Sequence, residues 1–181
     1  MNQDTTAPSG QLSRHRLTAA ILSTTSGVLP GFLTGALGVQ LRAELGFDES
    51  GLGLAVGAFF LGGAVSSAPM GRLAQRWGAA RSLRVALSLT VGCQLAAAVL
   101  VQSWGPLVAV LFISGLANGL NQPAANLLLT DGTPASRLGF AMALKQSGMP
   151  SATLLGGLAV PAFALTVGWR WAYAAAALLT V

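Results

Sequence analysis

The chain has 181 residues, of which 8% are charged and 53% are hydrophobic, and its formal net charge is +5. An ordinary soluble domain carries about 25% charged residues, so this composition excludes the soluble class, and it excludes a disordered chain, which would be rich in charge and poor in aliphatic residues. Nucleic-acid binding is not indicated either, because the basic residues lie between long apolar runs and not together on a polar face. The composition fits the lipid bilayer as solvent.

Long uncharged stretches locate the membrane spans. A helix needs about 20 apolar residues to cross the hydrocarbon layer. The uncharged stretches predict spans at about 17–41, 51–71, 83–103, 106–129 and 139–167, with Arg84 and Lys145 as the charged residues inside these bounds, and a sixth span begins near Trp169. We therefore predict an all-α, multi-pass transmembrane helix bundle over residues 17–181, with five complete spans and a truncated sixth. Residues 1–16 are predicted to be a disordered cytoplasmic tail.

The sixth span is short. Eleven uncharged residues follow Arg170, and they rise only about 16 Å as a helix, half of a bilayer. We expect from this that the sequence is a fragment or a truncated product. The alternative is a short last helix that dips into the membrane or lies at its interface.

The basic residues predict the orientation. Lys and Arg concentrate on the cytoplasmic side of membrane proteins. With the N-terminus in the cytoplasm, only Arg42 and Arg170 fall outside, and eight basic residues fall inside: Arg14, Arg16, Arg72, Arg76, Arg81, Arg84, Arg137 and Lys145. The bias predicts a multi-pass protein of the cell (cytoplasmic or inner) membrane with a cytoplasmic N-terminus.

The segment after the second span carries a motif. It reads Gly71-Arg72-Leu73-Ala74-Gln75-Arg76-Trp77-Gly78-Ala79-Ala80-Arg81. This resembles the loop signature of the major facilitator superfamily, G-x-L-A-D-R-x-G-R-K, with matches at Gly71, Leu73, Ala74, Arg76 and Gly78. The resemblance implies a gating role for Arg72 and Arg76. Gln75 replaces the usual aspartate, so the latch between the two halves of such transporters is expected to be weaker here.

The fifth span is similar to the Gly- and Pro-rich helix 5 motif of the same family, through Gly148, Pro150, Gly156 and Gly157. The resemblance covers residues 14–181 and implies the first six-helix half of a twelve-helix fold. A third motif is missing, because Gly115 stands where some proton-coupled members carry an arginine in helix 4.

Amide side chains follow one face of the fourth span. Asn118, Gln122 and Asn126 are spaced by four residues, and Asn121 lies beside them. Amides in hydrocarbon need hydrogen-bond partners, so this face does not point at lipid. Two interpretations stay open for Asn118 and Gln122: hydrogen bonding between helices, or a cavity wall that binds substrate. Asn121 is a further binding candidate, and Asn126, nearer the cytoplasmic end, is predicted to be structural.

Lys145 is the most informative single residue, because it lies inside the fifth span with Gln146 as its polar neighbour. One interpretation is that its side chain extends to the cytoplasmic surface. The other is that Lys145 and Gln146 face the cavity and attract an anionic substrate.

The function that these patterns favour is secondary transport of a small polar or anionic solute. A catalytic role is disfavoured, because the single histidine is in the N-terminal tail and no span holds Asp or Glu. We expect no cofactor, no metal and no nucleic acid as partner. Transport by alternating access needs a second bundle, either a missing C-terminal half or a second copy. The alternative is a truncated non-transporting membrane protein or an assembly subunit.

Overall fold

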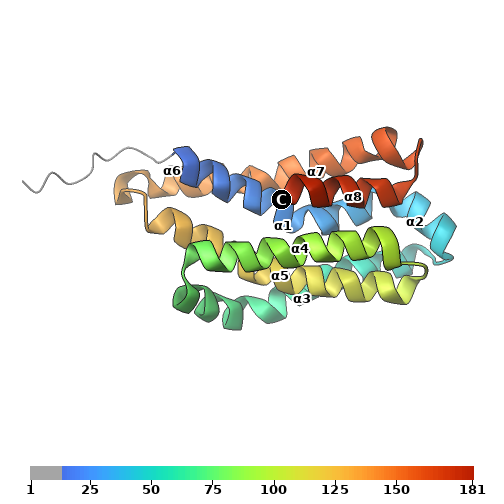
Figure 1. Ribbon diagram of the computed structural model, residues 1–181, viewed down its shortest axis with the longest axis horizontal. Helices are drawn as coiled ribbons and strands as arrows, with labels where there is room; N and C mark the ends of the chain where they lie inside the picture. Colours follow the sequence, from blue (N-terminus) through green and yellow to red (C-terminus); the bar gives the residue numbers. More distant parts are fainter. Residues whose placement is uncertain (1–13) are drawn as a thin grey trace, which may run out of the picture.

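The computed structural model describes residues 14–181, and the predicted tail lies outside them except for its last three residues. The described chain is helical (Figure 1). Its elements are α1 (Arg14–Ala36), α2 (Gly38–Leu45), α3 (Glu49–Trp77), α4 (Ala79–Leu100), α5 (Trp104–Thr130), α6 (Ala135–Gln146), α7 (Gly148–Ala159), the π-helical turn η1 (Val160–Ala164) and α8 (Trp169–Thr180).

The helices run up and down along one axis (Figure 1). Four of them, α1, α3, α4 and α5, are long and apolar enough to cross a membrane. The predicted all-α bundle is therefore confirmed as a fold class. The first predicted span corresponds to α1 and α2, which meet at Leu37, and the second, third and fourth correspond to α3, α4 and α5.

The fifth predicted span is divided into α6, α7 and η1. Pro150 accounts for the first division, because it has no N–H to donate to the carbonyl of Gln146. The helix therefore breaks at Ser147, whose hydroxyl donates to the Leu144 carbonyl at 2.7 Å. The sequence also predicts that Pro30 and Pro123 kink or locally open their spans. Both prolines lie inside single helices, α1 and α5, and the kinks stay a prediction.

The surface of the bundle is apolar. Large aliphatic and aromatic side chains are more than half exposed along its length, among them Leu54, Leu61, Val99, Phe140 and Leu178. A soluble protein rarely exposes such continuous apolar area. Together with the four membrane-length helices, it indicates that lipid surrounds the bundle.

Glycines hold α3 and α5 close together. These two helices make the most extensive contact in the bundle. A Cβ atom added at Gly115 would overlap the backbone carbonyl of Phe59, and one added at Gly62 would overlap that of Phe112. Small residues that let backbones approach are the usual basis of helix association in membranes. Gly115 is therefore required by packing, and an arginine at this position has no room.

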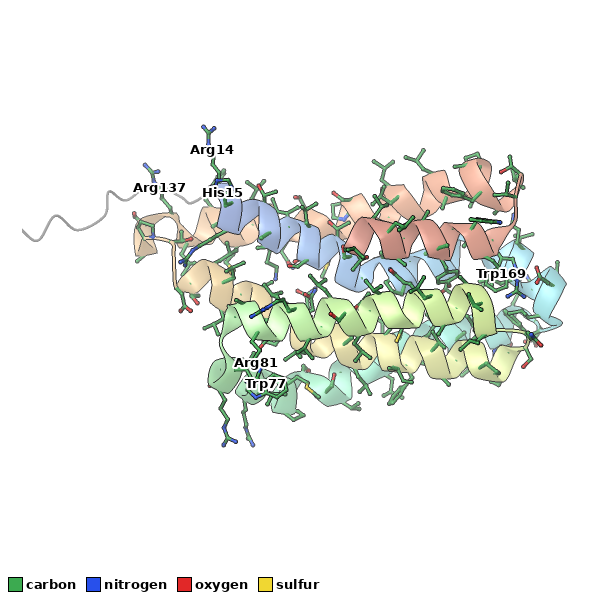
Figure 2. The ribbon with its side chains drawn as sticks, in the orientation of Figure 1. Arg14, His15, Trp77, Arg81, Arg137 and Trp169 are labelled. Atoms are coloured by element: carbon green, nitrogen blue, oxygen red, sulfur yellow. The ribbon has the colours of Figure 1, made fainter. Side chains whose placement is uncertain are left out.

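Charges divide the bundle into two ends. The basic end comprises Arg14 and Arg16 at the start of α1, Arg72 to Arg84 around the junction of α3 and α4, and Asp131 and Arg137 between α5 and α6. The acidic end comprises Arg42, Glu44, Asp48, Glu49 and Arg170. Figure 2 shows Arg14, Arg81 and Arg137 at one end of the molecule and Trp169 at the other.

The acidic end is closed by paired charges. Arg170 binds Glu44 at 2.7 Å and donates to the Val101 carbonyl at 2.8 Å, which joins α8 to α2 and to the end of α4. The Trp169 indole N–H donates to the second Glu44 oxygen at 2.6 Å. Arg42 pairs with Glu49. Both cations of this end therefore have a carboxylate partner.

Candidate functional site

Lys145 and the amides of α5 meet in the described structure. Lys145, near the end of α6, is only 3% exposed. Its Nζ donates to Gln122 Oε1 at 3.0 Å and to Asn126 Oδ1 at 2.7 Å. The side chain therefore turns into the bundle, onto the amide stripe, and does not extend to the surface.

Lys145 lies deep along its helix. It is ten residues after Ala135, the first residue of α6, which corresponds to about 15 Å of rise. The helix begins four residues before the predicted span, so Lys145 is further from the helix start than the sequence indicates. We call Lys145, Gln122 and Asn126 the lysine–amide cluster.

The amide stripe of α5 is open along part of its length. Asn126 is exposed, and Gln122 and Asn118 are half-buried. Gln122 Nε2 lies 3.5 Å from Asn118 Oδ1, so the three amides form a row that begins at Lys145. Asn126 was predicted to be structural, and the structure places it directly against the lysine.

Asn121 has a different environment from its neighbour Gln122. It is fully buried, and its Nδ2 donates to the backbone carbonyl of Ser23 on α1 at 2.7 Å. The side chain packs where Gly27 has no Cβ, because a Cβ there would overlap the Asn121 amide. Asn121 thus joins α5 to α1, while the binding role predicted for it stays a prediction.

Gln146 does not join the cluster. It follows Lys145 directly but is exposed, whereas Lys145 is buried against α5. Successive residues of a helix point about 100° apart, since 3.6 residues make a turn. The structure therefore separates the two side chains that the sequence paired as one candidate site.

The Gly71–Arg81 motif lies mostly on helix. Residues 71–77 form the last two turns of α3, and Gly78 alone connects α3 to α4, with φ of 78°. Only glycine adopts this backbone conformation without strain. Arg72, Gln75 and Arg76 are exposed, and Leu73 is half-buried. The Arg81 guanidinium lies over the ring of Trp77 at 5.0 Å, and both residues are labelled in Figure 2.

Two glycines of the helix 5 motif pack against α1, and a third lines an open groove. Gly148 and Gly156 face α1, where a Cβ would contact the carbonyls of Ile21 and Phe32 respectively. Gly157 has open space beside it and lines a groove with residues of α1 and α3: Gly31, Phe32, Gly35, Ala36, Val56 and Phe60, together with Thr153. Pro150 is exposed on the surface of α7.

Sequence reasoning did not identify this groove. The signal for it was present, because Gly31 and Gly35 recur on α1 and Gly157 on α7. Spacing alone does not show whether a glycine packs or leaves space, and here Gly31 lies against Phe59 while Gly35 is open. Within residues 14–181, no group of His, Cys, Asp and Glu is arranged to hold a metal ion.

Comparison with protein-family models identifies the class of this bundle. The model described as Major Facilitator Superfamily matches residues 17–181, almost the whole chain. The chain belongs to the Major Facilitator Superfamily. The resemblance drawn from the Gly71–Arg81 motif is confirmed. This membership is the basis of the function proposed below.

A curated relative agrees with this family. The chain is 28% identical over 148 residues to YwtG of Bacillus subtilis (strain 168), a candidate metabolite transport protein. The match covers 80% of this chain and 32% of the relative. The chain thus spans about a third of the length of the relative that it matches.

Proposed function

We propose that the chain is the N-terminal bundle of a secondary transporter that moves a small solute by alternating access. In this mechanism two helix bundles rock around a site near the middle of the membrane. The major facilitator membership supports the proposal, and so does the relative, which is about three times as long as the matched segment. A second bundle then closes the other side of the solute site.

The observation that carries the proposal is the open, polar row on α5. Asn118, Gln122 and Asn126 interrupt an otherwise apolar surface, and a buried lysine lies at one end of the row. Amides of this kind are costly against lipid. They are stable against a water-filled cavity between two bundles, which is where such transporters bind their solute.

The charges support an N-terminus in the cytoplasm. The basic end carries seven arginines and Asp131, and the acidic end carries two arginines and three carboxylates. Positively charged residues concentrate on the cytoplasmic side of membrane proteins, which supports the basic end as the cytoplasmic end. Single cysteines at Gln75 and at Phe47 in a Cys93→Ser background test this. A membrane-impermeant maleimide should label the second and not the first in intact cells.

Transport is tested with the full-length natural protein in proteoliposomes. Small carboxylates, sugars and amino acids are offered under an imposed proton or sodium gradient. We expect saturable, gradient-driven accumulation of at least one solute, which is absent from protein-free liposomes. A folded protein that moves none of them in either gradient direction would contradict the proposal and favour a non-transporting membrane subunit.

A further inference from the structure

Lys145 is a buried cation whose protein partners are neutral. Its ammonium group has three N–H donors, and two of them go to the amide oxygens of Gln122 and Asn126. The two salt bridges found within residues 14–181 are both at the acidic end, and neither includes Lys145. A charge held away from water without a counter-ion is unfavourable, so this position is suited to an anionic partner.

The lysine also orients the two amides. An ammonium group only donates hydrogen bonds, so each amide must turn its oxygen toward Nζ. The NH2 group of each amide then points away from the lysine. That of Gln122 faces Asn118 Oδ1 at 3.5 Å, and that of Asn126, an exposed residue, is directed to the open face of α5. The cluster therefore presents N–H groups, with a positive charge behind them, to whatever occupies that face.

From this arrangement we infer that the lysine–amide cluster binds the oxyanion group of a small solute, such as a carboxylate. This inference rests on the proposed transport function, because it names the chemical class of the solute at that site. Charge-assisted hydrogen bonds to an oxyanion are about twice as strong as neutral ones. The third ammonium N–H and the NH2 group of Asn126 supply donors for the oxygens of one oxyanion.

The carboxylates of the described chain do not serve this site. Glu44, Asp48 and Glu49 belong to the acidic end, and Asp131, at the end of α5, is exposed and forms no salt bridge with Lys145. A cationic solute is disfavoured, because the lysine repels it and the amide oxygens already accept from Nζ. The remaining occupant besides a solute anion is a carboxylate of the second bundle, which the experiment below distinguishes.

The test is anion-dependent thermal stability of the full-length protein in detergent. Cys93 is buried, so a fluorogenic maleimide reports unfolding as this thiol becomes accessible. Sodium acetate, sodium benzoate and sodium nitrate are titrated separately against sodium chloride at constant ionic strength. A ligand that binds only the folded state raises Tm with its concentration. We expect a saturable rise of about 3–8 °C with at least one of the three oxyanions.

Variants separate recognition from folding. Lys145→Gln should abolish the oxyanion-dependent rise, and Lys145→Arg should keep it. Thr34→Val should lower Tm by removing the buried bond to the Tyr173 hydroxyl, yet keep the rise. Arg42→Gln removes an equal charge from the acidic end and should change neither quantity by more than about 1 °C.

Two results overturn the inference. One is an undiminished oxyanion effect in folded Lys145→Gln. The other is a wild-type protein that responds to none of the three oxyanions, as expected if a carboxylate of the second bundle already neutralises Lys145. Transport of an uncharged solute without any oxyanion effect would contradict this inference alone. A clear oxyanion effect without transport of any solute would contradict the proposed function alone.

Discussion

The acidic end and the lysine–amide cluster hold their cations in opposite ways. At the acidic end, Arg170 is bound to Glu44 and covers the ring of Trp169 at 4.4 Å. In the lysine–amide cluster, Lys145 is more deeply buried and is bound only to neutral amides. A carboxylate neutralises the cation that it pairs with, so the pair stabilises the fold and attracts an anionic ligand only weakly. Neutral amides do not cancel the charge of the cation that they bind, so that cation can still attract an anionic ligand.

The contact between α3 and α5 supports both regions, because α3 begins at the acidic end and α5 carries the amides. Separating these helices should therefore have the largest effect on the protein. Gly115→Leu should destabilise the protein by about 3 kcal/mol or more, because the side chain meets the Phe59 backbone, which has no space to yield. Thermal unfolding in detergent and the yield of monodisperse protein measure this effect. Gly53→Leu is the matched control, because Gly53 is exposed with open space beside it.

Equal yield and Tm for Gly115→Leu and Gly53→Leu would contradict the close approach of α3 and α5.

Breaking the Arg170–Glu44 pair at the acidic end should lower the stability of the protein and leave its oxyanion response unchanged. Arg170→Gln removes the bonds to Glu44 and to the Val101 carbonyl, and we expect a loss of about 1–2 kcal/mol. The pair is partly exposed, so the coupling between Arg170 and Glu44 itself should be only about 0.5–1 kcal/mol. A double-mutant cycle of Arg170→Gln and Glu44→Gln measures that coupling through Tm.

An altered oxyanion response in Arg170→Gln would contradict the assignment of the acidic end to structure alone.

The lysine–amide cluster should lose recognition in steps. Gln122→Leu and Asn126→Leu keep approximate side-chain size and remove the amide dipole that faces Lys145. Each should raise the oxyanion concentration that gives the half-maximal rise in Tm, the midpoint, by about three- to tenfold, the effect of one hydrogen bond. Gln102→Leu makes the same change at an exposed position near the acidic end and should leave the midpoint unaltered. Unchanged midpoints in both amide variants would leave Lys145 without its proposed partners.

Arg42 gives the smallest effect. Its partner Glu49 is largely exposed, and such surface pairs contribute about 0.5 kcal/mol or less. Arg42→Gln should therefore shift Tm by at most about 1 °C. A loss as large as that of Arg170→Gln would show that the Arg42–Glu49 pair also holds the acidic end together.

Much of the fold is predictable from the sequence, because each membrane span appears as a stretch of about 20 residues with few charges. The uncharged stretches locate α1, α3, α4 and α5. The motif at Gly71–Arg81 identifies the family. Gly78 marks the junction of α3 and α4, where the backbone has a conformation that only glycine adopts without strain. The break at Ser147 was not predicted in place, although Pro150 signals a discontinuity nearby, because its position depends on how the freed carbonyl of Gln146 is accommodated.

The site was only partly predictable, because it depends on contacts between helices. The spacing of Asn118, Gln122 and Asn126 gives one face of α5, but it does not show that Lys145 of α6 lies on that face. Asn121 and Gln122 are adjacent in the sequence, yet one is buried against Ser23 and the other borders the open row. Likewise, the absence of an arginine at Gly115 is a motif difference in the sequence and a packing requirement in the structure.

Uptake kinetics of matched charge-removing variants test whether Lys145 binds the transported solute. The full-length natural protein, Lys145→Gln and Arg42→Gln are compared in proteoliposomes with the anionic solute that the transport assay identifies. We expect Lys145→Gln to raise KM by about 10- to 100-fold or to abolish uptake, since it removes a hydrogen-bonded charge, and Arg42→Gln to leave KM unchanged. Uptake by Lys145→Gln with an unchanged KM would contradict this expectation.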